Sequence, residues 1–249
     1  MKKLGNLVLD HWVEGDGDGT VLASAVDGAP VAAITSAGLD FAAILDHARR
    51  VGGPKLRRMT FHERGEMLKA LAKHLDGIKG ELYELSSRTG ATRRDSWPDI
   101  DGGISTMFVF SSKGRREMPN DHVYLDGPPE AISRNGTFVG QHICTPKLGA
   151  AIHINAFNFP CWGMLEKLAP ALLAGVPAIV KPASSTAYLT ELLVRRIQES
   201  GILPEGSLQL ICGSVGDLFD HLTCQDTIAF TGSKSTAELL QQHPRVVSE

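Results

Sequence analysis

The stretch GAAIHINAFNFPCWGMLEKLAPALLAGVPAIVKPASS, residues 149–184, decides the fold of this chain. Its apolar run AAIHIN, its polar loop, the helix-length segment CWGMLEKLAPALL and the second apolar run AIVK predict a strand, a loop, a helix and a strand in that order. The loop places Asn158 beyond the end of the first strand. A side-chain amide in that position can donate a hydrogen bond to an oxyanion, and no packing requirement explains it there. Asn158 is therefore a candidate catalytic residue.

The same alternation continues towards the end of the chain. Strands are predicted at residues 150–155, 178–181, 208–212 and 227–230, and helices follow them at 161–173, 187–199, 215–222 and 236–241. Strict alternation of this kind is typical of right-handed crossovers, which build a Rossmann-like α/β fold, a parallel sheet with helices on both faces. Ligands of such sheets bind beyond the carboxyl ends of the strands. The loops at these ends carry Asn158, Lys181, Gly213 and the run Thr231-Gly232-Ser233.

The first part of the chain contains short strands and then helices. Turn signals at residues 15–19 and at Asp27-Gly28 predict small strands or a hairpin. Thr60 and Glu63 form a capping box that begins a helix. The apolar residues that follow at helical spacing predict one buried stripe, made of Met67, Leu71, Ile78, Leu82 and Leu85.

Residues 126–147 differ in composition from their neighbours and predict an excursion, a segment that leaves the main body of the protein. Gly127 and the two prolines after it interrupt the chain, and Asn135-Gly136 is a strong hairpin-turn signal. The flanking segments, residues 131–134 and 137–143, are expected to pair as strands.

Composition excludes several classes of function. With 43% hydrophobic and 21% charged residues and a net charge of -3, the 249-residue chain has no basic face for nucleic acid or an anionic membrane. The start is too polar for a secretory signal, and no later run approaches membrane-spanning length. The cysteines show no CxxC pairing, so we expect reduced thiols and a cytoplasmic protein. No metal site is predicted, because neither the acidic residues Asp16 and Asp18 nor the histidines His62 and His74 have partners at ligand spacing.

A nucleotide site has indirect support only, since the dinucleotide fingerprint GxGxxG is absent. Lys181 ends an apolar strand, where its ammonium either binds ribose hydroxyls or phosphate or extends from the sheet into solvent. The runs Gly213-Ser-Val-Gly216 and Gly232-Ser233 are expected to enter helices, with Ser235 to Glu238 as a second capping box. Free amides at helix starts can hold a pyrophosphate, although turn glycines and caps are commoner than phosphate sites.

Cys161 can be interpreted either as a nucleophile or as a buried apolar residue. It begins a predicted helix close to Asn158, and a helix amino terminus lowers a thiol pKa, which would suit a nucleophile. However, no base neighbours it in sequence, and Pro160 and Trp162 make its surroundings apolar. We therefore favour a small buried hydrophobe at Cys161, and we expect Cys212 to lie in the core within a strand.

Four motifs in register resemble the first half of the aldehyde dehydrogenase superfamily. They are residues 157–160 (FNFP), 167–172 (KLAPAL), 181–183 (KPA) and 230–233 (FTGS). The resemblance covers nearly the whole chain, and the excursion resembles the oligomerisation strands of that family. Within the superfamily, residues 154–184 are most similar to the dehydrogenase domain that is paired with a ring-opening hydratase in phenylacetate degradation, which oxidises a coenzyme A-linked semialdehyde.

The resemblance implies a role for each matched residue. It divides the chain into a discontinuous NAD(P)-binding domain, residues 1–125 and 148–249, and an oligomerisation hairpin, residues 126–147, which implies a homo-oligomer. Asn158 would donate to the oxyanion of an aldehyde under thiolate attack, and Lys181 would bind the adenosine ribose. The remaining cofactor residues would line the adenosine and pyrophosphate: Gly216, Phe230, Gly232 and Ser233.

Three positions depart from the family pattern. Ser184 stands where many relatives have a glutamate that binds the ribose hydroxyls, and loss of that carboxylate removes repulsion against a 2′-phosphate. We therefore expect NADP rather than NAD. Ala237 replaces a second glycine after the FTGS motif, which affects the approach of the pyrophosphate, and Phe157 replaces a common tryptophan and keeps an aromatic wall.

The resemblance also implies that part of the enzyme is missing. Relatives are longer, their nucleophilic cysteine lies beyond residue 249, and none of Cys144, Cys161, Cys212 and Cys224 matches it. We thus expect a truncated chain without the catalytic cysteine domain and without dehydrogenase turnover of its own. Glu249 is either the general base of the family or precedes it. Two alternatives stay open: a non-catalytic nucleotide-binding or assembly module, and a reductase acting on an acyl-coenzyme A or acyl phosphate.

Overall fold

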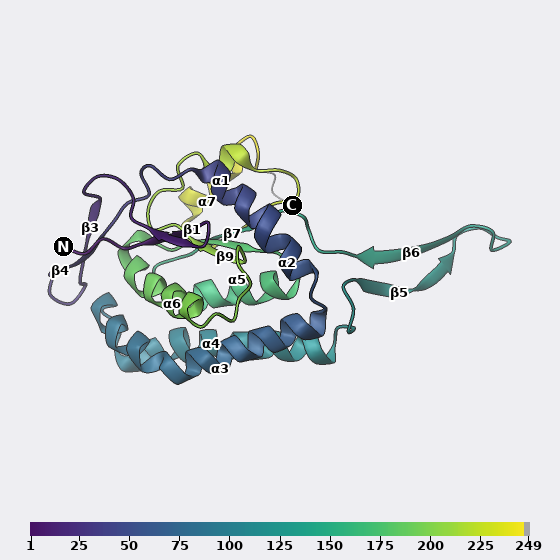
Figure 1. The fold of residues 1–249 in the computed structure, drawn as a ribbon, viewed down its shortest axis with the longest axis horizontal. Coiled ribbons are helices and arrows are strands. Elements are labelled where there is room, and N and C mark those ends of the chain that lie inside the picture. The colour runs from purple at the N-terminus through teal and green to yellow at the C-terminus, as the bar shows by residue number, and fades with distance from the viewer. Residues whose placement is uncertain (247–249) are drawn as a thin grey trace.

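A six-stranded sheet forms the centre of the molecule in the computed structural model, which describes residues 1–246 (Figure 1). Its strand order is β10-β7-β8-β9-β1-β2. The strands are β1 (Asn6–Val8), β2 (His11–Val13), β7 (Ala151–Ile154), β8 (Ala178–Lys181), β9 (Leu208–Leu210) and β10 (Thr227–Phe230). The four later strands run parallel, as predicted from the alternating pattern.

The sheet is mixed rather than wholly parallel, which corrects the expectation from the sequence. β1 pairs antiparallel with β9 through Leu7 and Leu210, and β2 pairs antiparallel with β1. The side chain of Asn6 stabilises this arrangement, because its Oδ1 accepts from the Cys212 amide at 2.7 Å and its Nδ2 donates to the Thr35 carbonyl at 3.0 Å. The amino-terminal strands thus cover the β9 edge, which would otherwise present unpaired backbone groups.

Helices cover both faces of the sheet, as predicted. On one face lie α5 (Trp162–Leu173) and α6 (Ala187–Glu199), and outside them α3 (Phe61–Ser86) and α4 (Arg93–Arg116) form a further layer (Figure 1). The other face carries α1 (Phe41–His47) and α2 (Gly53–Arg57), which a π-helical turn joins. The capping box at Thr60 and Glu63 is confirmed as the start of α3. Within the predicted α3 stripe, Met67, Leu71 and Leu82 are buried, and Ile78 and Leu85 pack at the edge of the core.

Two of the predicted carboxyl-terminal helices need correction. The helix expected at residues 215–222 is only a 3-10 turn, Leu218–His221, because Gly216 has a φ of 50°, which an α-helix cannot contain. α7 (Lys234–Gln241) begins two positions earlier than expected. Its cap is Ser233, whose side chain accepts from the Thr236 amide at 3.2 Å, and not the box predicted at Ser235.

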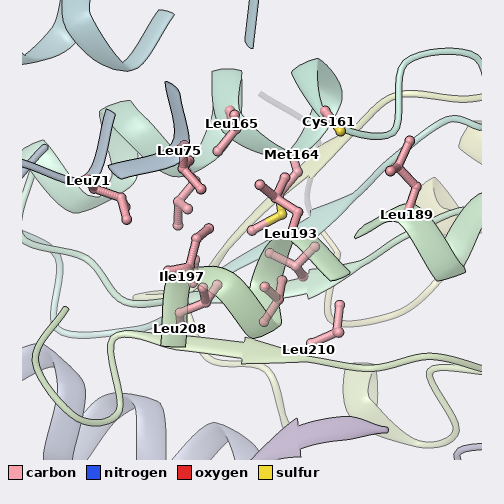
Figure 2. Close-up of a cluster of buried hydrophobic side chains, with 14 of the residues drawn as sticks. Leu71, Leu75, Cys161, Met164, Leu165, Leu189, Leu193, Ile197, Leu208 and Leu210 are labelled. Carbon is pink, nitrogen blue, oxygen red and sulfur yellow. The ribbon is translucent and has the colours of Figure 1, made fainter. Parts of the chain in front are cut away.

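The larger hydrophobic core lies between the sheet and the inner helices. Figure 2 shows part of it, where side chains of α3, α5, α6 and β9 meet: Leu71, Leu75, Cys161, Met164, Leu165, Leu189, Leu193, Ile197, Leu208 and Leu210. A second cluster on the opposite face includes Ile44, Leu45, Ile152 and Ile179. Burial on both faces explains why the sequences of the parallel strands are nearly continuous apolar runs.

Two hairpins lie outside the central sheet. β3 (Thr20–Ala23) and β4 (Pro30–Ile34) confirm the small hairpin predicted around residues 27–28. β5 (Tyr124–Ala131) and β6 (Val139–Cys144) project away from the body (Figure 1). The predicted strand at residues 131–134 is wrong in its bounds, because pairing ends at Ala131 and the next residues form the turn. The prolines after Gly127 lie where the register of the hairpin shifts, as expected for residues that lack an amide donor.

Candidate functional site

The carboxyl ends of β10, β7, β8 and β9 lie side by side along one edge of the sheet. Phe230 is paired with Ile154, and Ile154 with Lys181. Beyond the strands, the Asn155 amide donates to the Lys181 carbonyl at 3.0 Å, and the Thr231 amide donates to the Ile154 carbonyl at 2.9 Å. The loops that carry the candidate residues therefore start at neighbouring points of one edge.

A cleft of about 560 Å³ lies beside the ends of β8 and β9. It brings together three of the candidate cofactor residues, Lys181, Ser184 and Gly216. Its opposite wall comes from the amino-terminal part of the chain and includes Gly19, Thr20, Thr35, Ser36, Gly38 and Phe41. The sequence gives no local signal for this wall, because it reaches the cleft through the long-range pairing of β1 with β9.

Lys181 is the cationic group of this cleft. Burial lowers its pKa below the ordinary value, since the charged form loses solvent. Within residues 1–246, the ammonium of Lys181 forms no ion pair with a carboxylate, and no Asp or Glu lines the cleft. A partly buried ammonium without a counter-charge suits a ligand that brings hydroxyl or phosphate oxygens.

The glycines of the β9 loop allow the two walls of the cleft to approach each other. A Cβ at Gly213 would lie 2.6 Å from the Ser36 Oγ, and a Cβ at Gly216 would overlap the Phe41 ring. The Ser36 hydroxyl donates to the Ser214 carbonyl at 2.7 Å and joins the walls. The Gly216 amide donates to the Ser214 Oγ at 3.2 Å, so packing and local bonding account for this loop without a bound phosphate.

The FTGS segment lies apart from this cleft. Phe230 lines a separate cavity of about 550 Å³ with residues of β10, of α7 and of the segment before β10, among them Ile228, Leu240 and Leu222. A Cβ at Gly232 would overlap the Phe230 ring, and Ser233 caps α7. The structure therefore does not bring Phe230, Gly232 and Ser233 together with Lys181, and their cofactor role stays a prediction.

Asn158 lies in an exposed loop between β7 and α5. Among the residues that the structure describes, its amide has no hydrogen-bond partner. The flanking rings are also exposed, Phe157 by 64% and Phe159 by 39%, and Phe159 packs edge-on against Trp162 with 5.9 Å between centroids. An unpaired amide between aromatic rings at a strand end is available to donate to an external oxygen.

The interpretation of Cys161 as a buried hydrophobe is confirmed. Cys161 is completely buried, and burial, together with the nearby Asp99 carboxylate, raises its pKa well above the ordinary value. Burial likewise raises the pKa of Cys212, which lies just past the end of β9 and not within a strand as predicted. Cys144 and Cys224 are exposed and lie near Ala151 and Thr227, the first residues of β7 and β10, at the opposite end of these strands from the Asn158 loop. None of these thiols is placed to act as the nucleophile beside Asn158.

The histidines of α3 serve the packing of helices. His62 Nε2 contacts the Met118 carbonyl at 3.0 Å, and His74 Nε2 contacts the Arg196 carbonyl at 3.1 Å. Over residues 1–246, no group of three or more histidine, cysteine, aspartate or glutamate side chains is placed to hold a metal ion. In the same range, no helix has both the length and the apolar character needed to cross a membrane. Glu249, named as a possible general base, lies outside the described residues.

Comparison with known proteins gives a consistent result. The model of the aldehyde dehydrogenase family matches residues 12–246. A 3,4-dehydroadipyl-CoA semialdehyde dehydrogenase of Aromatoleum evansii is 42% identical over 247 residues, which cover 99% of this chain and 48% of that protein. A D-glyceraldehyde dehydrogenase (NADP(+)) of Picrophilus torridus is 30% identical over 190 residues, 74% of this chain and 36% of the relative.

Solved structures share the fold at lower identity. A NAD-dependent benzaldehyde dehydrogenase from Corynebacterium glutamicum superposes with a TM-score of 0.80 at 22% identity, over 98% of this chain and 53% of that one. An NADP-dependent glyceraldehyde-3-phosphate dehydrogenase from Bacillus halodurans gives a TM-score of 0.80 at 22% identity, over 98% and 51%. The chain thus spans about half the length of these two enzymes and of the Aromatoleum relative.

Proposed function

This chain belongs to the aldehyde dehydrogenase family, and on that premise we propose that it is the cofactor-binding part of an enzyme that oxidises an aldehyde to a carboxylic acid. The observation that carries the proposal is the shared edge of β7 and β8. There, the loop that carries the unpaired Asn158 amide begins next to Lys181, whose unpaired ammonium lies at the end of β8. An oxyanion donor and a nucleotide-binding cation are both needed at such a site.

In the proposed reaction, a thiolate adds to the aldehyde carbon, and Asn158 donates a hydrogen bond to the oxygen that becomes negatively charged. A bound nicotinamide cofactor supplies the hydride acceptor. The resulting thioester is then hydrolysed to the acid. The thiolate is proposed to come from a segment outside this chain, because Cys161 and Cys212 are buried with raised pKa values and Cys144 and Cys224 lie at the opposite end of the strands from Asn158.

The proposed cofactor is NADP rather than NAD. Lys181 and Ser184 lie in one cleft whose other polar side chains are the hydroxyls of Thr20, Thr35, Ser36 and Ser214. A glutamate at position 184 would repel a 2′-phosphate, whereas a serine hydroxyl can donate to it.

The proposed substrate is a coenzyme A-linked semialdehyde of aromatic degradation, in the phenylacetate branch. The support for a coenzyme A-linked semialdehyde is the 42% identity, over nearly all of this chain, to a relative named 3,4-dehydroadipyl-CoA semialdehyde dehydrogenase. The phenylacetate branch is proposed from the sequence resemblance of residues 154–184 alone. Much of the aldehyde pocket is expected from the part of the enzyme outside this chain, so the substrate must be identified on the complete protein.

The β5–β6 hairpin is proposed to join copies of the protein into a homo-oligomer in the cytoplasm. It projects from the body and exposes Leu125, Ile132, Phe138, Val139 and Ile143, each by more than half. An apolar two-stranded ribbon of this kind is poorly stable alone and gains from pairing with other strands.

Two measurements test the proposed function. Titration of the chain with NADP and NAD tests cofactor binding, and a screen of semialdehydes and acyl-coenzyme A substrates with the complete protein tests the direction of the reaction. Aldehyde-dependent NADPH formation supports the proposal, whereas NADPH consumption with an acyl-coenzyme A or acyl phosphate would indicate the reductase. Cofactor binding without either activity would indicate a non-catalytic module.

A further inference from the structure

Asp99 of α4 holds the first turn of α5, although the two are 62 positions apart in the sequence. Its Oδ1 accepts hydrogen bonds from the backbone amides of Cys161, at 2.9 Å, and Trp162, at 2.8 Å. The residue is only 4% exposed. A buried carboxylate at the amino terminus of a helix satisfies amides that have no partner within the helix and interacts favourably with the helix dipole.

Two glycines on α4 bring Asp99 within reach of α5. A Cβ at Gly103 would lie 3.0 Å from the Trp162 Cα, and a Cβ at Gly102 would lie 3.1 Å from the Trp162 ring. Side chains at these positions would push α5 away from α4. Since glycine is unfavourable inside a helix, consecutive glycines here are explained by the close approach of the two helices.

Burial, together with the same carboxylate, raises the pKa of Cys161 and keeps it from acting as an activated thiol. A cysteine at a helix amino terminus ordinarily has a lowered pKa, but here the Asp99 carboxylate occupies the first amides and adds a negative charge next to the sulfur. Cys161 itself faces the buried apolar cluster of α5 and α6 (Figure 2). The structure at this helix start is therefore arranged for positioning and not for nucleophilic chemistry.

The Asn158 loop is anchored at both of its ends. At its start, the Asn155 amide is bound to the Lys181 carbonyl. At its end, the Phe159 carbonyl accepts from the Gly163 amide at 2.8 Å, and the Pro160 carbonyl accepts from the Thr190 hydroxyl at 3.3 Å. The second anchor is the α5 turn that Asp99 holds.

We propose that Asp99 is a positioning residue, which fixes the Asn158 amide by holding the first turn of α5 against α4. The inference rests on the proposed role of Asn158 as the oxyanion donor. Asp99 itself is buried and acts on the reaction only through the backbone amides of Cys161 and Trp162.

The first test is hydrogen exchange of the peptide that covers residues 156–163 in the chain itself. Asp99→Ala is expected to speed exchange there by about tenfold or more, and Asp99→Asn, which keeps an acceptor oxygen, to have an intermediate effect. Asp101→Ala is the matched control on the same helix, because the Asp101 carboxylate accepts hydrogen bonds from Lys79 and Tyr83 of α3 rather than from α5. Exchange within about twofold of the unmodified chain in both Asp99 variants would overturn the proposal. Should Asp99→Ala not fold, exchange in Asp99→Asn that stays within about twofold of exchange in Asp101→Asn would overturn the proposal.

The second test is kinetic and uses the complete protein that contains this chain. Asp99→Ala is expected to lower kcat by about tenfold with little change in the KM for the cofactor, and Asp99→Asn to restore part of kcat. In the Asn158→Ala background, Asp99→Ala should cause no further loss, because both changes remove the same interaction. If Asn158→Ala has no effect, the proposed function fails. If Asn158→Ala lowers kcat and Asp99→Ala multiplies that loss fully, the role of Asp99 fails while the proposed function stands.

Discussion

The backbone amide of Asn155 donates to the carbonyl of Lys181 at 3.0 Å, across the carboxyl ends of β7 and β8. This bond fixes where the Asn158 loop leaves the sheet relative to the strand that ends in Lys181. The proposed oxyanion donor and the proposed ribose-binding cation therefore lie on adjacent connections of one sheet edge, which is where ligands of open parallel sheets bind.

Removal of the Lys181 ammonium tests its role in the cleft. Lys181→Met should weaken NADP binding by about 10- to 100-fold, since a hydrogen bond to a charged group contributes about 1.5–3 kcal/mol. Isothermal titration of the chain measures the change. Lys69→Met is the control, because Lys69 lies on the outer helix α3 beside Glu66. Equal NADP affinity in the two variants would show that Lys181 does not contact the cofactor.

Position 184 is expected to set the cofactor preference. Ser184→Glu places a carboxylate in the cleft with Lys181 and should favour NAD over NADP by about tenfold relative to the unmodified chain, because a carboxylate repels a 2′-phosphate. Ser185→Glu adds the same charge one position along, at an exposed residue that does not line the cleft. A preference shift of the same size in both variants would assign the effect to overall charge.

Gly216 combines a left-handed backbone with a close contact. Gly216→Ala should lower the free energy of unfolding, because the φ of Gly216 is 50° and the new Cβ would overlap the Phe41 ring. Backbone strain alone costs about 1–3 kcal/mol, and the overlap should add to that cost. Gly201→Ala is the matched control, since Gly201 has a φ of 64° but open space around it. Urea unfolding compares the two. A cost at Gly216 no greater than at Gly201 would contradict the packing described for the cleft wall.

Thiol reactivity separates the four cysteines. In the folded chain, a disulfide reagent should modify the exposed Cys144 and Cys224 rapidly and leave the buried Cys161 and Cys212 unmodified. Burial raises the pKa of both protected thiols, so little reactive thiolate forms. Mass spectrometry of the modified peptides identifies the sites. Rapid modification of Cys161 would support the alternative interpretation, in which Cys161 is a nucleophile.

The β5–β6 hairpin is expected to mediate self-association. Ile143→Asp should shift the sedimentation of the chain towards the monomer, since Ile143 is an exposed apolar side chain on β6 and a charge there disfavours strand-to-strand contact. Leu239→Asp, on the exposed face of α7, is the control. An unchanged sedimentation profile for Ile143→Asp would exclude the hairpin as the main interface.

Local signals predicted the carboxyl-terminal half of the fold well. β8, α6 and β10 have the predicted bounds, because glycine, proline and polar turn residues separate strongly apolar segments there. The helix expected at residues 215–222 failed, because the backbone conformation of Gly216 was not evident from the sequence. α4 is hard to delimit from the sequence, because Pro98, Gly102 and Gly103 interrupt its apolar stripe.

Non-local contacts account for what the sequence could not predict about the site. Lys181, Ser184 and Gly216 share one cleft because Lys181 ends β8, Ser184 follows β8 and Gly216 follows β9, and their role in cofactor binding stays a prediction. The Thr35, Ser36 and Phe41 wall depends on the pairing of Leu7 with Leu210, which no local pattern indicates. In the sequence, nothing distinguishes Asp99 from other carboxylates of a helix. Its role is evident only from the contact between α4 and α5.

The central claim is that this chain forms the cofactor-binding half of an aldehyde-oxidising site, and calorimetric titration of the 249-residue chain with NADP and NAD tests it most directly. We predict saturable binding of NADP that is tighter than that of NAD, without NADPH formation when aldehyde is added to the isolated chain. Absence of binding by either nucleotide would contradict the claim. Tighter binding of NAD would contradict the assignment of Ser184, and robust NADPH formation would contradict the absence of the nucleophile from this chain.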